Sequence, residues 1–191
     1  MIYLKVIVKG GHNMTYSEQM LDQLEAGKLK EAQNSFKLAL INDDDDMLFS
    51  LAEELYALGF LQQARTIYLK LLDRYPDEDE LKTNLATIAI DEGHNDEALS
   101  YLAQIKPDSP AYVQSLLVAA DLYQTEEEFE VTEEKLKEAY ALAPDEPAVE
   151  FALGEFYFMV GQYSEAIQYY FQLIKNGYTD FAKVDIAGRL G

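Results

Sequence analysis

The hydrophobic positions of this chain recur at helical spacing. Leu48, Leu51, Ala52 and Leu55 are offset by three, four and seven residues, which places them on one face of an α-helix. A second helical stripe follows each first stripe after a turn, so the pattern predicts helix–turn–helix hairpins. Corresponding first-helix stripes are Leu85, Ala86 and Ala89; Leu116, Ala119, Ala120 and Tyr123; and Leu153, Gly154 and Tyr157.

The hairpins repeat with a fixed period. Gly27, Gly59, Gly93 and Gly161 are each followed five residues later by alanine, and their separations are 32, 34 and twice 34 residues. A glycine supplies the positive φ that ends a helix at low cost. Glu127 stands where the missing glycine would fall, so that repeat is expected to be degenerate.

These residues resemble tetratricopeptide repeats. The fifth repeat carries the resemblance best, with Leu153-Gly154, Tyr157, Gly161-Gln162-Tyr163, Glu165-Ala166 and Tyr170. The resemblance implies an all-α fold, a right-handed α-solenoid of stacked hairpins with about five repeats and the first helix of a sixth. It is specific for fold and weak for function, because this family binds many unrelated partners.

The period also divides the chain. We expect an extension or linker at 1–13 and a tetratricopeptide domain at 14–191. The first repeat keeps only its second helix clearly, and the third is expected to have a shortened second helix ending near Lys106-Pro107. Because the final helix lacks a hairpin mate, we expect a fragment of a longer repeat protein, with a naturally short cap as the alternative. The expected repeats are 14–44, 45–78, 79–112, 113–146 and 147–180, with a partial repeat at 181–191.

Composition narrows the class of partner. The chain has 15 Lys and Arg against 35 Asp and Glu, a net charge of -20, which argues against nucleic acid and favours a basic or amphipathic partner. It has no cysteine and no apolar run near the ~18 residues of a membrane span. Ile2–Val8 is too short for a signal peptide; it is an unanchored tail or docks in a neighbour's groove. A cytoplasmic protein without membrane contact is expected.

Catalytic signatures are missing from the sequence. It contains no phosphate-binding glycine loop and no Gly-x-Ser-x-Gly elbow, and neither His12 nor His94 lies in a His-Glu-x-x-His motif. The acidic run 43–46 lacks the spacing of a calcium loop and is expected to cap a helix. We therefore predict a protein that is not an enzyme and has no cofactor or metal.

The resemblance implies a binding surface on the first helices of the hairpins, because ligands of this family usually lie along the concave side. The inward residues are predicted to be acidic and aromatic, without the lysines and arginines that clamp a peptide carboxylate in one subgroup; Asn84 is the nearest remnant. Some of them are alternatively inter-repeat core. The predicted lining is Asp46, Phe49, Glu53, Tyr56, Glu80, Thr83, Thr87, Ile90, Gln114, Leu117, Asp121, Gln124, Ala148, Phe151, Glu155 and Phe158.

Three functions remain open at this point. The first is a scaffold or adaptor that holds a basic or amphipathic peptide segment in the acidic-aromatic groove. The second is a receptor for a peptide signal, or a regulatory module of a larger protein. The third is a self-assembly module that forms homo-oligomers through its terminal repeats.

Overall fold

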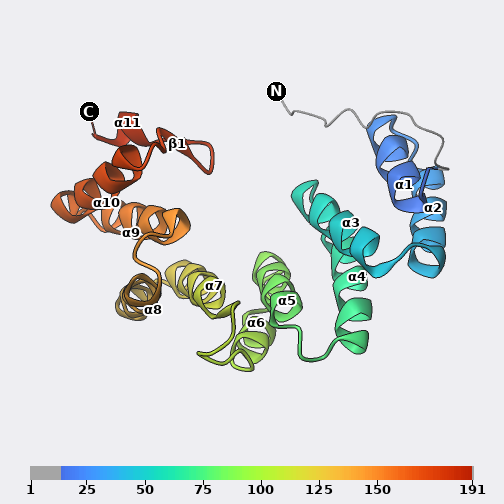
Figure 1. Cartoon of the computed structure of the whole chain (residues 1–191), viewed down its shortest axis with the longest axis horizontal. Helices are drawn as coiled ribbons and strands as arrows, with labels where there is room; N and C mark the ends of the chain where they lie inside the picture. Colours follow the sequence, from blue (N-terminus) through green and yellow to red (C-terminus); the bar gives the residue numbers. More distant parts are fainter. Residues whose placement is uncertain (1–13, 191) are drawn as a thin grey trace. The chain divides into compact units, whose positions relative to one another are not determined.

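The computed structural model describes residues 14–190, and Figure 1 shows their helices in chain order. The chain divides after Arg74 into two compact units, unit 1 and unit 2, which are described separately. Each predicted repeat range from 14–44 to 147–180 holds one helical hairpin, so the predicted all-helical array is confirmed. The expectations for 1–13, including the Ile2–Val8 strip, lie outside the described residues.

Unit 1 consists of two hairpins. The first helix of the first repeat, which the sequence pattern left unclear, begins with a full capping box: the Glu18 amide donates to the Thr15 hydroxyl (3.1 Å), and the Thr15 amide donates to the Glu18 carboxylate (2.8 Å). Met20 anchors this helix in the core. The helices of unit 1 are α1 (Tyr16–Glu25), α2 (Leu29–Asn42), α3 (Asp45–Ala57) and α4 (Leu61–Arg74).

The acidic run between α2 and α3 caps helices, as predicted. The Asp44 carboxylate accepts a hydrogen bond from the Met47 amide at 2.9 Å and so begins α3. The Asp43 carboxylate accepts from both the amide (2.7 Å) and the hydroxyl (2.6 Å) of Ser17 and ties the start of α1 to the end of α2.

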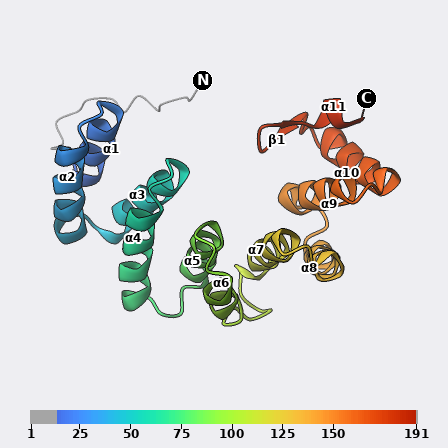
Figure 2. The ribbon, with the colours of Figure 1, turned by 180° about the vertical axis from the view of Figure 1, so that it is seen from behind.

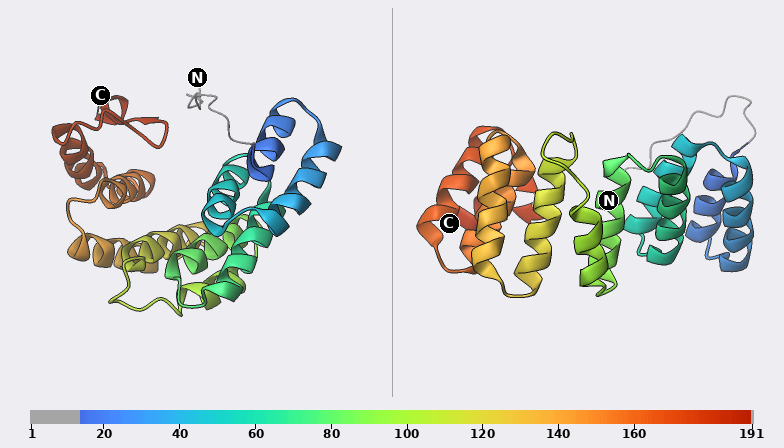
Figure 3. Two further views of the ribbon diagram at one scale, coloured as in Figure 1. Left: turned by 45° about the vertical axis from the view of Figure 1, so that its right-hand side comes forward. Right: turned by 90° about the horizontal axis from the view of Figure 1, so that it is seen from below.

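Unit 2 contains three further hairpins, whose paired helices lie side by side in Figures 2 and 3. Alanines and leucines at equal repeat positions form its core, among them Ala86, Ala120, Leu153 and Leu173. Its helices are α5 (Asp79–Asp91), α6 (Asn95–Leu102), α7 (Tyr112–Thr125), α8 (Phe129–Leu142), α9 (Pro147–Met159) and α10 (Tyr163–Lys175).

The turn of the fourth hairpin keeps its geometry without glycine. Glu127 has φ 61°, close to the 79° of Gly161 in the next hairpin. The amide after each of these residues donates back to the helix, from Glu128 to the Tyr123 carbonyl and from Gln162 to the Tyr157 carbonyl, both at 2.8 Å. Glu127 therefore adopts a left-handed conformation that is unfavourable for a residue with a Cβ atom.

The second helix of the third repeat is short, as predicted. α6 ends at Leu102, and the residues up to Ala111 form a loop that contains Pro107 and Pro110. Because the period is kept, residues that would have formed another helical turn are used in this loop.

The last segment differs from the expected helix starting at Phe181. Two short antiparallel strands come first, β1 (Asp180–Phe181) and β2 (Val184–Asp185), joined by Ala182 and Lys183 at positive φ. The helix α11 (Ile186–Leu190) begins after Asp185, whose carboxylate accepts from the Gly188 amide at 2.9 Å. Asp185 is thus a helix-capping residue, which explains the late start.

Candidate peptide-binding face

The predicted lining residues lie on the first helices of four hairpins: α3 in unit 1, and α5, α7 and α9 in unit 2. On α3, Asp46 and Glu53 are exposed, whereas Phe49 and Tyr56 are partly buried. The Phe49 ring packs edge-on against Tyr68 of its own hairpin, with the ring centroids 5.8 Å apart. Phe49 therefore contributes to packing within the hairpin as well as to the face.

On α5 the predicted residues separate into exposed and packed positions. Glu80 is exposed, but Thr83 is only 3% exposed and its hydroxyl donates to the Asp79 carbonyl at 3.0 Å. The Thr87 hydroxyl donates in the same way to the Thr83 carbonyl at 3.1 Å. The structure thus corrects the expectation for Thr83, because its polar group is used inside the helix.

A recess of about 790 Å³ opens beside the first turns of α5 and α7. It includes three of the predicted residues, Glu80, Thr83 and Gln114, together with Asn84. Five carboxylates and two lysines line it, so the recess is negatively charged. Its remaining lining residues are Asp77, Glu78, Asp79, Lys82, Gln104, Lys106, Asp108, Ser109, Pro110 and Ala111.

The lysines do not form a clamp for an acidic ligand. The Lys82 ammonium group lies 2.7 Å from the Asp79 carboxylate in a part-buried ion pair. This hydrogen bond is the main reason that the pKa of Asp79 lies below its ordinary value, and a hydrogen bond from Ser109 and the charge of Lys106 act in the same direction. Lys82 is therefore neutralised by its own helix, and the open carboxylates determine the charge.

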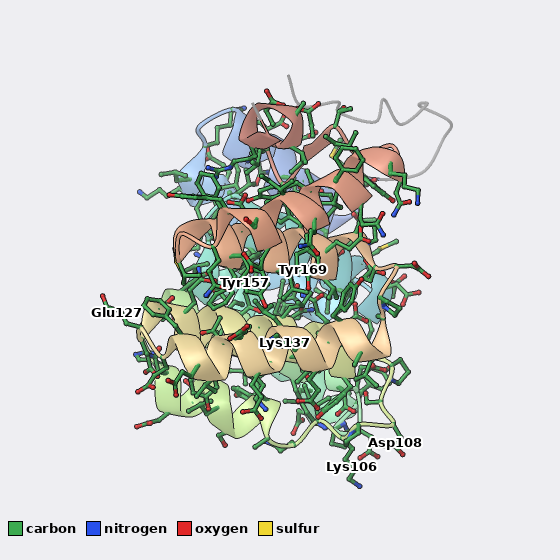
Figure 4. The ribbon with its side chains drawn as sticks, turned by 90° about the vertical axis from the view of Figure 1, so that its left-hand side faces the viewer. Lys106, Asp108, Glu127, Lys137, Tyr157 and Tyr169 are labelled. Carbon is green, nitrogen blue, oxygen red and sulfur yellow. The ribbon has the colours of Figure 1, made fainter. Side chains whose placement is uncertain are left out.

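One wall of the recess comes from the α6–α7 loop, which sequence reasoning did not include in the site. Lys106 and Asp108 project from this loop, as Figure 4 shows. The available signal was the short second helix of the third repeat with two prolines after it. A projection from helical spacing alone does not reach loop residues.

The other end of α7 is also acidic. Partial burial raises the pKa of the Asp121 carboxyl above its ordinary value, and the nearby charge of Asp91 on α5 raises it further. Gln124 is partly buried, and Leu117 packs against the core formed by α7 to α10. Negative charge thus lies at both ends of the α5–α7 pair.

On α9 the three predicted residues come together, but the chain itself covers them. Phe151 packs against Phe181, with the ring centroids 5.0 Å apart. The Glu155 carboxylate accepts from the Tyr170 hydroxyl at 2.6 Å and from the Arg189 guanidinium at 3.0 Å. That guanidinium also lies 4.4 Å from the centroid of the Phe158 ring. At this position the alternative of inter-repeat packing describes the contacts.

The described chain offers little other chemistry. Within residues 14–190 no group of three or more His, Cys, Asp or Glu side chains is placed to hold a metal ion. In the same part of the chain, no helix combines the length and apolar character needed to cross a bilayer.

Comparison with known proteins agrees with the hairpin architecture. Residues 12–128 match the family described as tetratricopeptide repeat protein 21 ARM repeat, and residues 124–178 match the YpiA-like tetratricopeptide repeats. The chain is 36% identical over 158 residues to the TPR repeat-containing protein YpiA of Bacillus subtilis (strain 168). The match covers 82% of this chain but only 37% of that relative.

Two solved structures are similar in fold. A thermophilic TPR protein of Thermus thermophilus, TTC0263, has a TM-score of 0.68 and 25% identity, covering 92% of this chain and 97% of the other. PilW, a type IV pilus biogenesis factor, has a TM-score of 0.65 and 20% identity, covering 92% and 84%. Folds of this kind are scaffolds for protein–protein interaction.

Proposed function

We propose that this chain, which belongs to the tetratricopeptide repeat proteins, is a non-catalytic cytoplasmic scaffold that binds a basic or amphipathic peptide segment of another protein on the α5–α7 face of unit 2. The observation that carries the proposal is the acidic recess at the start of these helices. Its five carboxylates exceed its two lysines, and one of those lysines is paired with Asp79.

The recess favours a cationic side chain for electrostatic reasons. Glu80 and Asp108 stand on opposite walls, one from α5 and one from the loop. A lysine or arginine entering between them gains two attractions, each worth about 0.2–1 kcal/mol for exposed groups. The net charge of the chain also raises the rate at which a basic segment arrives.

The neighbouring surface favours an extended or amphipathic segment over a single cation. Asp121 provides a second negative position on α7, and Leu117 and Ile90 supply partly buried apolar surface between the two. A peptide with basic residues at both ends and an apolar side chain between them matches this order. An acidic C-terminal peptide does not.

Fluorescence polarisation with two labelled peptides tests the proposal. One is an amphipathic lysine- and arginine-rich peptide, and the other has every basic residue replaced by glutamate and a free terminal carboxylate. The basic peptide is expected to bind with an affinity that falls as salt increases, because screening weakens surface charge pairs. Tighter binding of the acidic peptide would overturn the proposal.

A pair of charge-matched variants locates the site. Glu80→Gln combined with Asp108→Asn removes two carboxylates from the recess and is expected to weaken binding roughly three- to tenfold. Asp96→Asn combined with Glu130→Gln removes the same charge from exposed positions on α6 and α8 and is expected to change binding less. Equal losses in both variants would show that the net charge acts without the recess.

A further inference from the structure

The helix α10 carries an exposed apolar side. Tyr163, Ile167 and Phe171 are 58%, 46% and 63% exposed, and their spacing of four residues places them along one side of the helix. Ile174 continues this side and is partly buried. We call Tyr163, Ile167, Phe171 and Ile174 the α10 stripe. Large apolar side chains gathered on one side of a helix indicate a surface for packing.

The repeat shows what this side of the helix does. One period of 34 residues before Ile167, Phe171 and Ile174 lie Glu133, Lys137 and Tyr140 of α8. In α8 this side faces the following hairpin, because the Tyr140 ring packs edge-on against Tyr169 with the ring centroids 5.5 Å apart.

A second contact supports the same assignment. The Tyr157 hydroxyl donates to the Glu133 carboxylate at 2.8 Å. Figure 4 shows Tyr157 and Tyr169 in the layer of side chains between Lys137 on α8 and the helices of the next hairpin. The stripe of α10 therefore occupies a helix-packing position.

The charge of α10 indicates the kind of partner that fits the stripe. This helix has one acidic residue, Glu165, and one basic residue, Lys175, within a chain of net charge -20. A basic peptide finds few carboxylates on α10, whereas an equally neutral, apolar helix can approach it without charge repulsion. A second copy of the chain brings such a helix in its own α10.

We propose that two copies of this chain pair through the α10 stripe, with the two helices antiparallel about a two-fold axis at the level of residue 169. This register places Ile167 opposite Phe171 of the second copy and Tyr163 opposite Lys175. The apolar side chains then bury each other, and each lysine lies near a tyrosine ring. The acidic α5–α7 recess takes no part in the pairing.

Mass measured across a concentration series tests the pairing. Sedimentation equilibrium is expected to show a monomer–dimer equilibrium that shifts toward the dimer as salt rises, because salt screens the repulsion between two strongly acidic chains. This salt dependence is opposite to that expected for peptide binding, so failure of one proposal does not imply failure of the other. A monomer at every concentration and salt level, or a ladder of higher oligomers, would overturn the pairing.

A swap of residues between repeats locates the contact. Ile167→Glu combined with Phe171→Lys gives α10 the residues that α8 has at these positions, and it is expected to raise the dimer dissociation constant at least about tenfold. Circular dichroism establishes that the hairpin remains folded. The control, Leu69→Lys with Leu142→Glu, changes exposed leucines on α4 and α8 and is expected to leave the dimer intact. Loss of the dimer only in the control would place the contact elsewhere.

Cross-linking determines the direction of the helices. The chain has no cysteine, so single Ile167→Cys and Phe171→Cys variants each introduce one thiol. An antiparallel pairing is expected to yield more disulfide between the two variants mixed together than within either variant alone. A preference for disulfides between identical variants would overturn the proposed register.

Discussion

The hairpins α7–α8 and α9–α10 are consecutive copies of one architecture, yet they differ at equal repeat positions. The fourth hairpin has Leu116 and Ala120 where the fifth has Glu150 and Gly154. The reverse holds at the turn, where the fourth has Glu127 and the fifth Gly161. Each hairpin therefore departs from the repeat pattern in a different place.

The comparison teaches that some departures are compensated and others are not. Gly154 leaves room for Tyr170, whose hydroxyl then reaches Glu155. Glu150, in contrast, is buried with one carboxylate oxygen that has no hydrogen-bond partner in the described structure. A residue exchange between the two hairpins should be costly where a compensating contact exists and favourable where it does not.

The largest effect is expected for Gly154→Ala, which imports the residue of the fourth hairpin. A Cβ atom at this position would lie 2.6 Å from Cε1 and 2.9 Å from Cδ1 of the buried Tyr170 ring. Overpacking of this kind costs about 1–3 kcal/mol of unfolding free energy, measured by urea denaturation.

Importing both residues tests the compensation. Gly154→Ala with Tyr170→Leu recreates the Ala120–Leu136 pair and is expected to recover part of the loss. A single Gly154→Ala variant that is as stable as the parent would show that the tyrosine ring moves freely.

The second effect has the opposite sign. Glu150 is 2% exposed, and burial, aided by the charge of Asp145, raises the pKa of its carboxyl above the usual 4.5, against a hydrogen bond with Asn176. Glu150→Leu, the residue present at Leu116, is expected to increase the unfolding free energy at neutral pH by about 1–3 kcal/mol, because a buried polar atom without a partner is lost.

The pH dependence of this gain checks its cause. A raised pKa means that the folded state holds the proton more tightly than the unfolded state, so the ionised carboxylate lowers stability above that pKa. The difference between Glu150→Leu and the parent should therefore shrink as the pH falls through the raised pKa toward 4.5. Lys82→Leu is the matched control at the same repeat position; it breaks the ion pair with Asp79 and should destabilise. A constant gain at all pH values would argue against a burial penalty.

A smaller gain is expected at the turn. Glu127→Gly gives the fourth hairpin the residue that the fifth has at Gly161 and removes the left-handed strain, worth about 1 kcal/mol. The rise in melting temperature measures it. Glu134→Gly, at an exposed position within α8, should instead lower stability by about 1 kcal/mol. If both glycines destabilise, backbone strain at Glu127 costs less than the added freedom of the unfolded chain.

The smallest effect concerns the contact that distinguishes Glu155 from Asp121. Arg189→Gln removes a partly exposed ion pair with Glu155 and the cation–π contact with Phe158, at an expected cost of about 0.5–1 kcal/mol that decreases with salt. A double-mutant cycle with Glu155→Gln measures the coupling. Coupling that is unchanged in high salt would contradict an ionic contribution.

Helical spacing and glycine period were sufficient to predict the hairpins, because side chains three and four residues apart must share a helix face. They also predicted the short α6 from its prolines. They did not predict the late start of α11, since an Asp185 cap competes with the continuing repeat pattern.

The candidate site was less predictable for a related reason. Spacing gives the side of the helix on which a residue lies, and Glu80 and Gln114 do line the recess. It does not show whether a residue distant in sequence covers that side, as Phe181 and Arg189 do on α9. Nor does it include loop residues such as Asp108.

The short α6 shows how a repeat protein can gain a recognition surface without changing its length. Converting a helical turn into a loop leaves the 34-residue spacing intact, so α5 and α7 remain in contact register while a new wall of side chains appears between them. Recognition can thus be varied within this loop, through Lys106 and Asp108, at positions that carry little of the core. Loop grafting between such repeats would change specificity while leaving the array itself unaltered.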